Sequence, residues 1–290
     1  MTKPEAAVTL AVLQMEPAFG ETAANVARSL ALIEDAAAKG AQVIVLPELC
    51  NTGYMFASRA EAASLAEPVP SGPSSRAWID IAARLGLHIV AGITESDGDR
   101  LYNSAVIIGP SGYLGTYRKL HLWGDEALYF TPGDLGIPIF DTPLGRISCH
   151  ICYDCWFPEV WRLQAMQGAE LICVPTNWVP IPGQDPTREA MANIIVMGAA
   201  HSNSLFVAAA DRVGTERGQP FIGQSLIVSQ TGWPVAGPAS ASDEETLIAT
   251  VNLADARRKR NWNDFNQPLR DRRTDLYDTM LGSGLPRGFV

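Results

Sequence analysis

A cysteine at a predicted turn is the first residue of this sequence that could do chemistry. Cys152 follows an alternating segment, 145–151, that predicts a strand, and Pro158 suits the first turn of a helix. A tight strand-to-helix turn exposes a nucleophile and directs backbone N–H groups toward the atom that it attacks. Cys152 could therefore be the nucleophile of a hydrolase, although most free cysteines are buried and inert.

A glutamate and a lysine lie where they could assist that thiol. Glu48 follows the apolar run 43–46 and Pro47, so its carboxylate is expected at the carboxyl end of a strand, where α/β folds gather reactive groups. Lys119 lies near the start of a long irregular segment that reaches Pro138, and long structured loops are uncommon unless they build a site. Taken singly, a strand-end glutamate is more often structural, and a lysine is usually exposed.

Two other kinds of site compete with this interpretation. Cys149, Cys152 and Cys155 form a Cys-x-x-Cys-x-x-Cys run that could hold zinc or an iron–sulfur cluster. Strand alternation would direct the first two thiols to opposite faces, so packing roles are favoured for the outer two cysteines. A papain-like pairing of cysteine with histidine is the other alternative, and its candidates are the four histidines His88, His121, His150 and His201.

The elements that would position these residues occur twice along the chain. Three segments of the first half recur in the same order in the second half, 39–48 as 167–176, 88–93 as 205–210 and 103–112 as 224–232. Their strands are apolar on both faces, so each sheet needs cover on both sides. This predicts an α/β fold, a four-layer α-β-β-α sandwich of two mixed sheets with an internal pseudo-twofold duplication.

The lack of a linker predicts one globular domain, and the charge of the chain makes some partners poor candidates. No Pro/Gly/Ser-rich linker separates the halves, so we predict a single domain over residues 1–290. The net charge of −9 comes with no dense basic block apart from the short run 257–260, which disfavours nucleic acid as a partner. The amino terminus lacks an apolar signal core and no stretch is long enough to cross a membrane, so we expect a cytoplasmic protein without a membrane partner. Five cysteines, an odd number, favour reduced thiols.

The motifs around the three residues resemble, in chain order, those of the nitrilase superfamily of carbon–nitrogen hydrolases. The matching segments are 46–49 around the glutamate, 117–122 around the lysine and 151–159 around the cysteine. The resemblance implies the sandwich fold and a homodimer or higher oligomer in which a carboxyl-terminal tail, about 262–290, crosses to the partner. It also implies a second acidic residue near the lysine, which here is Glu126.

The resemblance implies a mechanism for these residues as well. Glu48 takes the proton of the Cys152 thiol, and the thiolate attacks an amide carbonyl while Lys119 and the backbone N–H of Tyr153 stabilise the oxyanion. Glu48 then protonates the departing ammonia and activates water against the thioester. This chemistry needs neither a metal nor an organic cofactor.

The residues after the cysteine favour amides over nitriles. True nitrilases typically carry Cys-Trp-Glu where this chain has Cys-Tyr-Asp at 152–154, and segment 156–159 is similar to that of N-carbamoylputrescine amidase. Several aromatic residues predict a pocket for a neutral, partly apolar acyl group. We therefore predict a small primary amide as substrate, with an N-carbamoyl amine as the alternative. Substrate binding is assigned to Tyr54, Tyr153, Trp156, Asn177 and Trp178.

Overall fold

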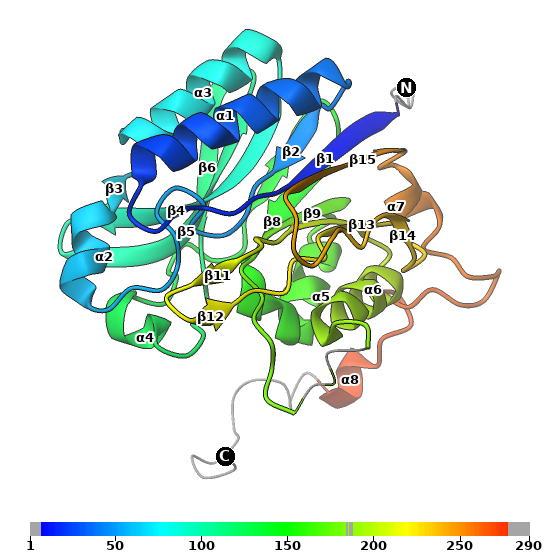
Figure 1. The fold of residues 1–290 in the computed structure, drawn as a ribbon. Coiled ribbons are helices and arrows are strands. Elements are labelled where there is room, and N and C mark those ends of the chain that lie inside the picture. The colour runs from blue at the N-terminus through cyan, green and yellow to red at the C-terminus, as the bar shows by residue number, and fades with distance from the viewer. Residues whose placement is uncertain (1–6, 184, 186–187, 278–290) are drawn as a thin grey trace.

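Two β-sheets lie face to face between two layers of helices (Figure 1). The computed structural model describes residues 7–183, 185 and 188–277. The first sheet has the strand order β15-β1-β2-β4-β5-β6, with β3 paired to β4. Its strands are β1 (Val8–Gln14), β2 (Val43–Val45), β3 (Glu67–Pro68), β4 (His88–Asp97), β5 (Arg100–Gly109), β6 (Gly112–Arg118) and β15 (Glu245–Val251).

The second sheet has the order β14-β13-β10-β9-β8-β7. Its strands are β7 (Ile139–Asp141), β8 (Arg146–Cys149), β9 (Leu171–Pro175), β10 (Phe206–Ala210), β13 (Leu226–Val228) and β14 (Pro234–Ala236). A separate small hairpin pairs β11 (Thr215–Glu216) with β12 (Gln219–Pro220).

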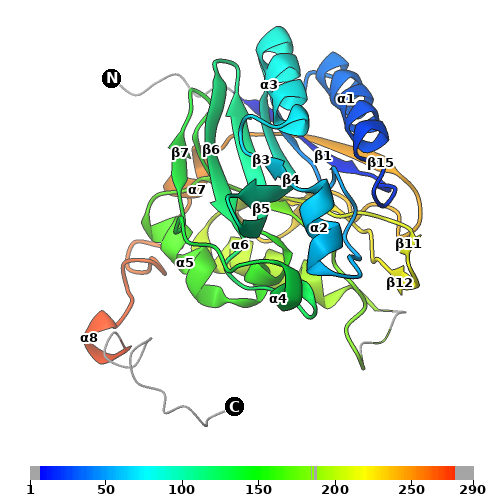
Figure 2. The same cartoon turned by 90° about the vertical axis from the view of Figure 1, so that its left-hand side faces the viewer.

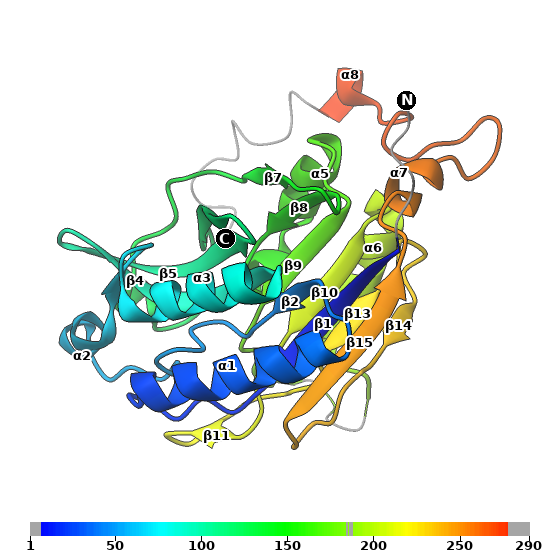
Figure 3. The same ribbon diagram turned by 90° about the horizontal axis from the view of Figure 1, so that it is seen from above.

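Helices cover the outer face of each sheet (Figure 2). The first sheet is covered by α1 (Thr22–Ala38) and α3 (Pro73–Leu85), which lie along it when the molecule is seen from above (Figure 3). The second sheet is covered by α5 (Pro158–Met166) and α6 (Met191–Asn203). The shorter elements are α2 (Arg59–Leu65), α4 (Glu126–Tyr129), the 3₁₀ turn η1 (Cys152–Trp156), α7 (Asp255–Arg258) and α8 (Thr274–Tyr277).

Local sequence explains where the covering helices begin and end. Pro73 occupies the first turn of α3, where its missing N–H costs nothing, and Gly86 ends the helix in the left-handed conformation. In α1 the buried positions recur at helical spacing, so one stripe of the helix faces the sheet. These positions are Asn25, Ser29, Leu32, Ile33 and Ala36.

The two sheets repeat one pairing pattern. In the first sheet β15 is antiparallel to β1, the pairs β1–β2 and β2–β4 are parallel, and β4–β5 and β5–β6 are antiparallel. The second sheet runs through the same sequence of pairings from β7 to β14. The four-layer sandwich is confirmed, and the repeated order is the internal duplication that the sequence echo predicts.

The core between the sheets is continuous. Leu10 and Val45 of the first sheet and Ile147 and Val174 of the second belong to one apolar cluster. A second cluster, which includes Trp78 of α3, fills the space between the first sheet and its helices. Neither sheet buries its inner face alone, and the single domain over residues 1–290 stays a prediction.

The carboxyl-terminal segment leaves the sandwich after α7 and carries α8 at some distance from the sheets (Figure 1). Trp262 and Phe265 in this segment are largely exposed, at 56% and 83%. Of the predicted tail, 278–290 lies outside the described residues, and the use of the tail in a dimer stays a prediction. In the part of the chain that the structure describes, no helix is both long and apolar enough to cross a membrane.

Candidate active site

Cys152 lies on the strand-to-helix turn that the sequence predicts. Strand β8 ends at Cys149, the 3₁₀ turn begins at Cys152, and α5 begins at Pro158. The φ angle of Cys152 is 48°, a left-handed conformation that side-chain-bearing residues adopt at a cost of about 1–2 kcal/mol. Its side chain is only 5% exposed. The turn therefore presents the thiol to the interior of a pocket rather than to open solvent.

Lys119 is bound between two carboxylates. Its Nζ lies 2.7 Å from Oε1 of Glu48 and 2.7 Å from Oε1 of Glu126, and all three side chains are buried. Asn103 of β5 donates from Nδ2 to the same Glu48 oxygen at 2.6 Å. Tyr54 donates its hydroxyl to Glu126 Oε1 at 2.6 Å. These contacts bring together Glu48, which follows β2, Lys119, which follows β6, and Glu126, which lies in the segment after β6.

Glu48 can approach β4 only because a glycine lies opposite it. A Cβ atom on Gly92 would come within 2.5 Å of the Glu48 Cα and 2.4 Å of the Pro47 oxygen. From the segment that follows β9 in the second sheet, Asn177 donates from Nδ2 to the Glu48 backbone oxygen at 2.9 Å. The backbone of Glu48 is therefore held by both halves of the duplication.

Only one of the two carboxylate oxygens of Glu48 is used by the contacts with Lys119 and Asn103. Oε1 accepts hydrogen bonds from Lys119 and Asn103, whereas Oε2 is buried with no hydrogen-bond partner among the described residues. A buried carboxylate oxygen without a donor is unfavourable, and such groups mark places where a proton or a ligand is expected.

The charges of this cluster act on one another. Burial opposes the charged form of Lys119, but the carboxylates of Glu126 and Glu48 outweigh it and hold the lysine pKa well above its ordinary value. Burial, opposed by the charge of Lys119, raises the pKa of Glu126. Burial and the charge of Glu48 raise the pKa of Cys152 well above its usual range, although Lys119 opposes this. Cys152 is therefore a neutral thiol at rest and needs a base to react as a thiolate.

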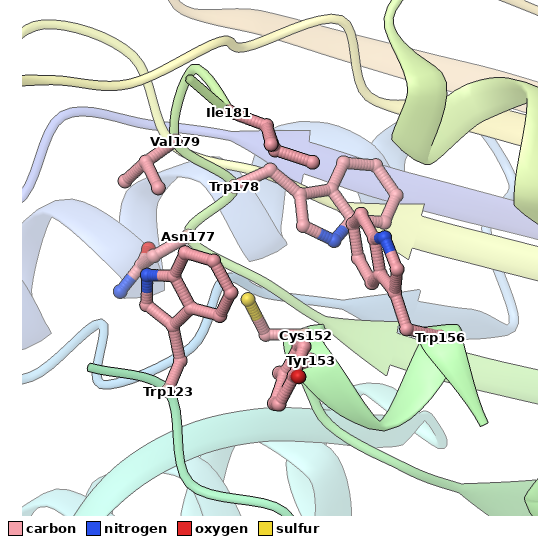
Figure 4. Close-up of a pocket in the computed structure, with 8 residues that line it drawn as sticks. All are labelled: Trp123, Cys152, Tyr153, Trp156, Asn177, Trp178, Val179 and Ile181. Carbon is pink, nitrogen blue, oxygen red and sulfur yellow. The ribbon is translucent and has the colours of Figure 1, made fainter. Parts of the chain in front are cut away.

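Cys152 lines a small pocket with uncharged walls (Figure 4). The other lining residues are Trp123, Tyr153, Trp156, Asn177, Trp178, Val179 and Ile181. Its volume is about 20 Å³, which is room for one or two water-sized groups. Four of the five residues assigned to substrate binding, all except Tyr54, thus lie beside the thiol.

A larger cavity of about 210 Å³ adjoins this pocket and shares Trp123 and Val179 with it. Tyr54 lines this second cavity, as do Asp125 and Glu126. Asp125 is exposed, so the second cavity carries an acidic group that the pocket around Cys152 lacks.

The other cysteines and the histidines face elsewhere. Cys149 and Cys155 are buried, and burial raises the pKa of each well above its usual range. Among the described residues, no group of three or more His, Cys, Asp or Glu side chains could hold a metal ion. His150 lies 3.0 Å from Gln164 and 3.4 Å from Cys155, and His121 stacks on Phe157. No histidine of the described chain lines the pocket of Cys152.

Asp154 is a supporting residue that the sequence did not single out. Its Oδ2 accepts hydrogen bonds from the Tyr117 hydroxyl at 2.7 Å and from the Ile151 N–H at 3.0 Å. Its Oδ1 accepts one from the His121 N–H at 3.0 Å and lies 2.7 Å from Nδ1 of the same residue. Asp154 therefore joins the turn of Cys152 to the segment of Lys119. No local pattern signals the contacts with Tyr117 and His121, because these residues come from β6 and from the segment that follows it.

Replacing Asp154 by alanine is expected to lower the free energy of unfolding by about 2–4 kcal/mol, since it leaves several buried donors without an acceptor. Urea unfolding would measure the loss. Asp141→Ala removes an exposed carboxylate and serves as the control, with an expected change below about 0.5 kcal/mol. Equal losses in the two variants would show that Asp154 does not hold the turn.

Comparisons with known proteins show the family to which this chain belongs. Residues 9–261 match the family model described as carbon-nitrogen hydrolase. The chain is 42% identical over 272 residues to a protein named nitrilase from Pyrococcus abyssi, covering 93% of this chain and 99% of the relative. It is 35% identical to an N-carbamoylputrescine amidase from Solanum lycopersicum, covering 97% of each. A crystal structure of a carbon-nitrogen hydrolase from Helicobacter pylori G27 matches with a TM-score of 0.85 at 28% identity, covering 96% of this chain and 99% of that chain. The chain therefore belongs to the carbon–nitrogen hydrolase family and is an amide-hydrolysing enzyme.

Proposed function

We propose that this protein cleaves a small primary amide to a carboxylate and ammonia through a thioester on Cys152. The observation that carries the proposal is the division of labour at Glu48. One carboxylate oxygen is held by Lys119 and Asn103, and the other is buried without a donor among the described residues. The charge of this carboxylate also acts on the Cys152 thiol. These features suit a base that takes the thiol proton.

Acylation begins with transfer of the Cys152 proton to Glu48. The thiolate attacks the amide carbon, and the carbonyl oxygen gains negative charge. Lys119 is the buried cation beside this site, and with the backbone N–H of Tyr153 it stabilises that charge. Glu126 holds Lys119 from the other side and keeps it protonated. Lys119 therefore supplies charge and transfers no proton.

Collapse of the tetrahedral intermediate breaks the C–N bond. Glu48 returns its proton to the departing nitrogen, and ammonia leaves. Glu48 then takes a proton from a water molecule as that water attacks the thioester, and it gives the proton to the thiolate as the carboxylic acid is released. The thiol and the ionised carboxyl of Glu48 are restored.

An N-carbamoyl amine is the second candidate substrate. The larger cavity next to the pocket carries Asp125, whose carboxylate could pair with a distant ammonium group. The relative from Solanum lycopersicum is named N-carbamoylputrescine amidase, which fits such a substrate. The uncharged walls around Cys152 favour the neutral amide instead.

An ammonia-release screen separates these substrates. Aliphatic and aromatic amides, N-carbamoyl amines and the matching nitriles are incubated with the enzyme at equal concentration. We expect primary amides to turn over faster than their nitriles, on the Cys-Tyr-Asp sequence at 152–154. The comparison with nitriles is informative because the relative from Pyrococcus abyssi is named nitrilase. A nitrile turned over faster than its amide would contradict the proposal, and a preference for N-carbamoyl amines would favour the second candidate.

A further inference from the structure

The indole N–H of Trp178 stands apart from those of the other buried tryptophans. Trp78 donates its N–H to the Ser29 hydroxyl at 2.9 Å, and Trp161 donates to the Cys155 oxygen at 2.8 Å. Trp178 is only 2% exposed, yet its Nε1 has no hydrogen-bond partner among the described residues. Buried donors are almost always paired in native proteins, so an orphan of this kind calls for an acceptor.

The orphan donor faces the reaction centre. Trp178 lines the pocket of Cys152, and its indole nitrogen lies on the ring edge turned toward the sulfur (Figure 4). Its backbone is fixed on both sides, since its N–H donates to Asp211 Oδ1 at 2.9 Å and its oxygen accepts from the Ile222 N–H at 3.0 Å. The donor is therefore held in place before any ligand arrives, which keeps the cost of binding low.

The charge of the pocket limits what the acceptor can be. No lysine or arginine lines the pocket in the described chain. The buried Lys119 is already engaged by two carboxylates, and the buried Arg212 is paired with Glu216 at 2.7 Å. A carboxylate on the acyl group would lose its hydration there without gaining a cation, whereas a neutral acceptor would lose little.

We infer that Trp178 is a specificity-determining residue whose N–H donates to an uncharged acceptor atom on the acyl group of the substrate. The acceptor is an ether, hydroxyl or carbonyl oxygen, or a ring nitrogen. It belongs to the first few atoms beyond the amide carbonyl, because the pocket around Cys152 is small. This inference rests on the proposed function, in which the acyl group enters this pocket when Cys152 attacks.

A water molecule on Nε1 would leave the expectation unchanged. Displacing such a water with an apolar group loses its hydrogen bond, whereas an acceptor on the substrate replaces it. Either way, an acyl group with a well-placed acceptor is favoured over an apolar group of the same shape.

The test uses pairs of amides that differ by one atom or group. Methoxyacetamide and butyramide differ by an ether oxygen in place of a methylene, lactamide and isobutyramide by a hydroxyl in place of a methyl, and nicotinamide and benzamide by a ring nitrogen. We expect the acceptor-bearing member of at least one pair to have a kcat/KM about 5- to 100-fold higher in the parent enzyme. A ratio near one in every pair would overturn the inference without any variant.

Trp178→Phe then removes the donor and keeps an aromatic ring in the pocket. We expect this variant to bring the preferred pair to a ratio of about one, mainly by slowing the acceptor-bearing amide. Trp156→Phe is the matched control, because Trp156 lines the same pocket but its N–H is not a buried orphan. This control should keep the parent ratio even if its rates fall. A ratio that persists in Trp178→Phe, or that vanishes equally in both variants, would remove the role of Trp178.

Binding measurements distinguish a failure of this inference from a failure of the proposed function. Each amide pair is titrated calorimetrically against Cys152→Ala, with and without Trp178→Phe. Amide hydrolysis without any Trp178-dependent preference would overturn the inference and leave the proposed function standing. A Trp178-dependent preference in binding, together with a parent enzyme that hydrolyses no amide, would keep the donor role of Trp178 and overturn the proposed function.

Discussion

Replacing Cys152 by alanine is expected to lower amide turnover by about 10⁴-fold or more, to the background of the assay. The thiol forms the covalent bond to the substrate, so no other group can substitute for it. Because the turn is fixed by backbone contacts and by Asp154, the variant should keep the far-ultraviolet circular dichroism and the urea midpoint of the parent within error. Turnover above one hundredth of the parent rate would exclude Cys152 as the nucleophile.

The neighbouring cysteines provide matched controls. Cys149→Ala and Cys155→Ala remove thiols of the same motif, and both thiols are buried in the same apolar core cluster. Each should retain amide turnover within about tenfold of the parent and lose some stability through the small cavity that it creates. If either variant were as inactive as Cys152→Ala while folded, the assignment of packing roles to these two thiols would be wrong.

Neutralising Glu48 or Lys119 should also remove most activity, for different reasons. Glu48→Gln keeps the shape of the side chain but cannot move protons, so kcat should fall by about 10²- to 10⁴-fold. Lys119→Ala removes the charge that meets the oxyanion and should slow the chemical step by about 100-fold or more. The second variant also leaves two buried carboxylates without their cation and is expected to lose about 3–5 kcal/mol of stability.

Thiol alkylation distinguishes the two variants. The charge of Glu48 raises the pKa of Cys152 and the charge of Lys119 lowers it, each added to the effect of burial. The pH profile of iodoacetamide alkylation should therefore move to lower pH in Glu48→Gln and to higher pH in Lys119→Ala. Mass spectrometry of the Cys152 peptide would follow the reaction.

Different results would contradict the role of Glu48 and the role of Lys119. Amide turnover in Glu48→Gln above one tenth of the parent rate would show that Glu48 is not the base. An alkylation profile that does not move in folded Lys119→Ala would show that its charge does not reach the thiol. Lys119→Ala combined with Glu126→Gln removes one of the stranded carboxylate charges, and it provides a more stable protein for the same measurement.

Much of the fold could be predicted because its signals are local. The apolar runs that become β2 and β9 are each followed by a proline, and the repetition of three segments in order indicates two like sheets. Similar local signals, an apolar or alternating run and a nearby proline, predicted Glu48 after a strand and Cys152 on a strand-to-helix turn. The structure has both residues there. These positions depend on the alternation of a few neighbouring residues, which a sequence displays directly.

Other parts of the site depended on contacts between distant segments. Asn103 donates to Glu48 across 55 residues, Tyr54 to Glu126 across 72, and Asp154 accepts from Tyr117 across 37. Polar residues in strands and turns are common, and no periodicity tells which of them face each other. The role of Asp154 therefore could not be read from its motif.

The sequence by itself determined the kind of fold, the chain order of the three reactive groups and the turn that carries the thiol. Only the tertiary structure decided that Lys119 lies between two buried carboxylates. It also decided that, among the described residues, one oxygen of Glu48 lacks a donor and the N–H of Trp178 faces the pocket without an acceptor. The physical reason is that burial and hydrogen-bond pairing are set by how distant strands and loops pack together, whereas local periodicity determines only which face of each element is apolar.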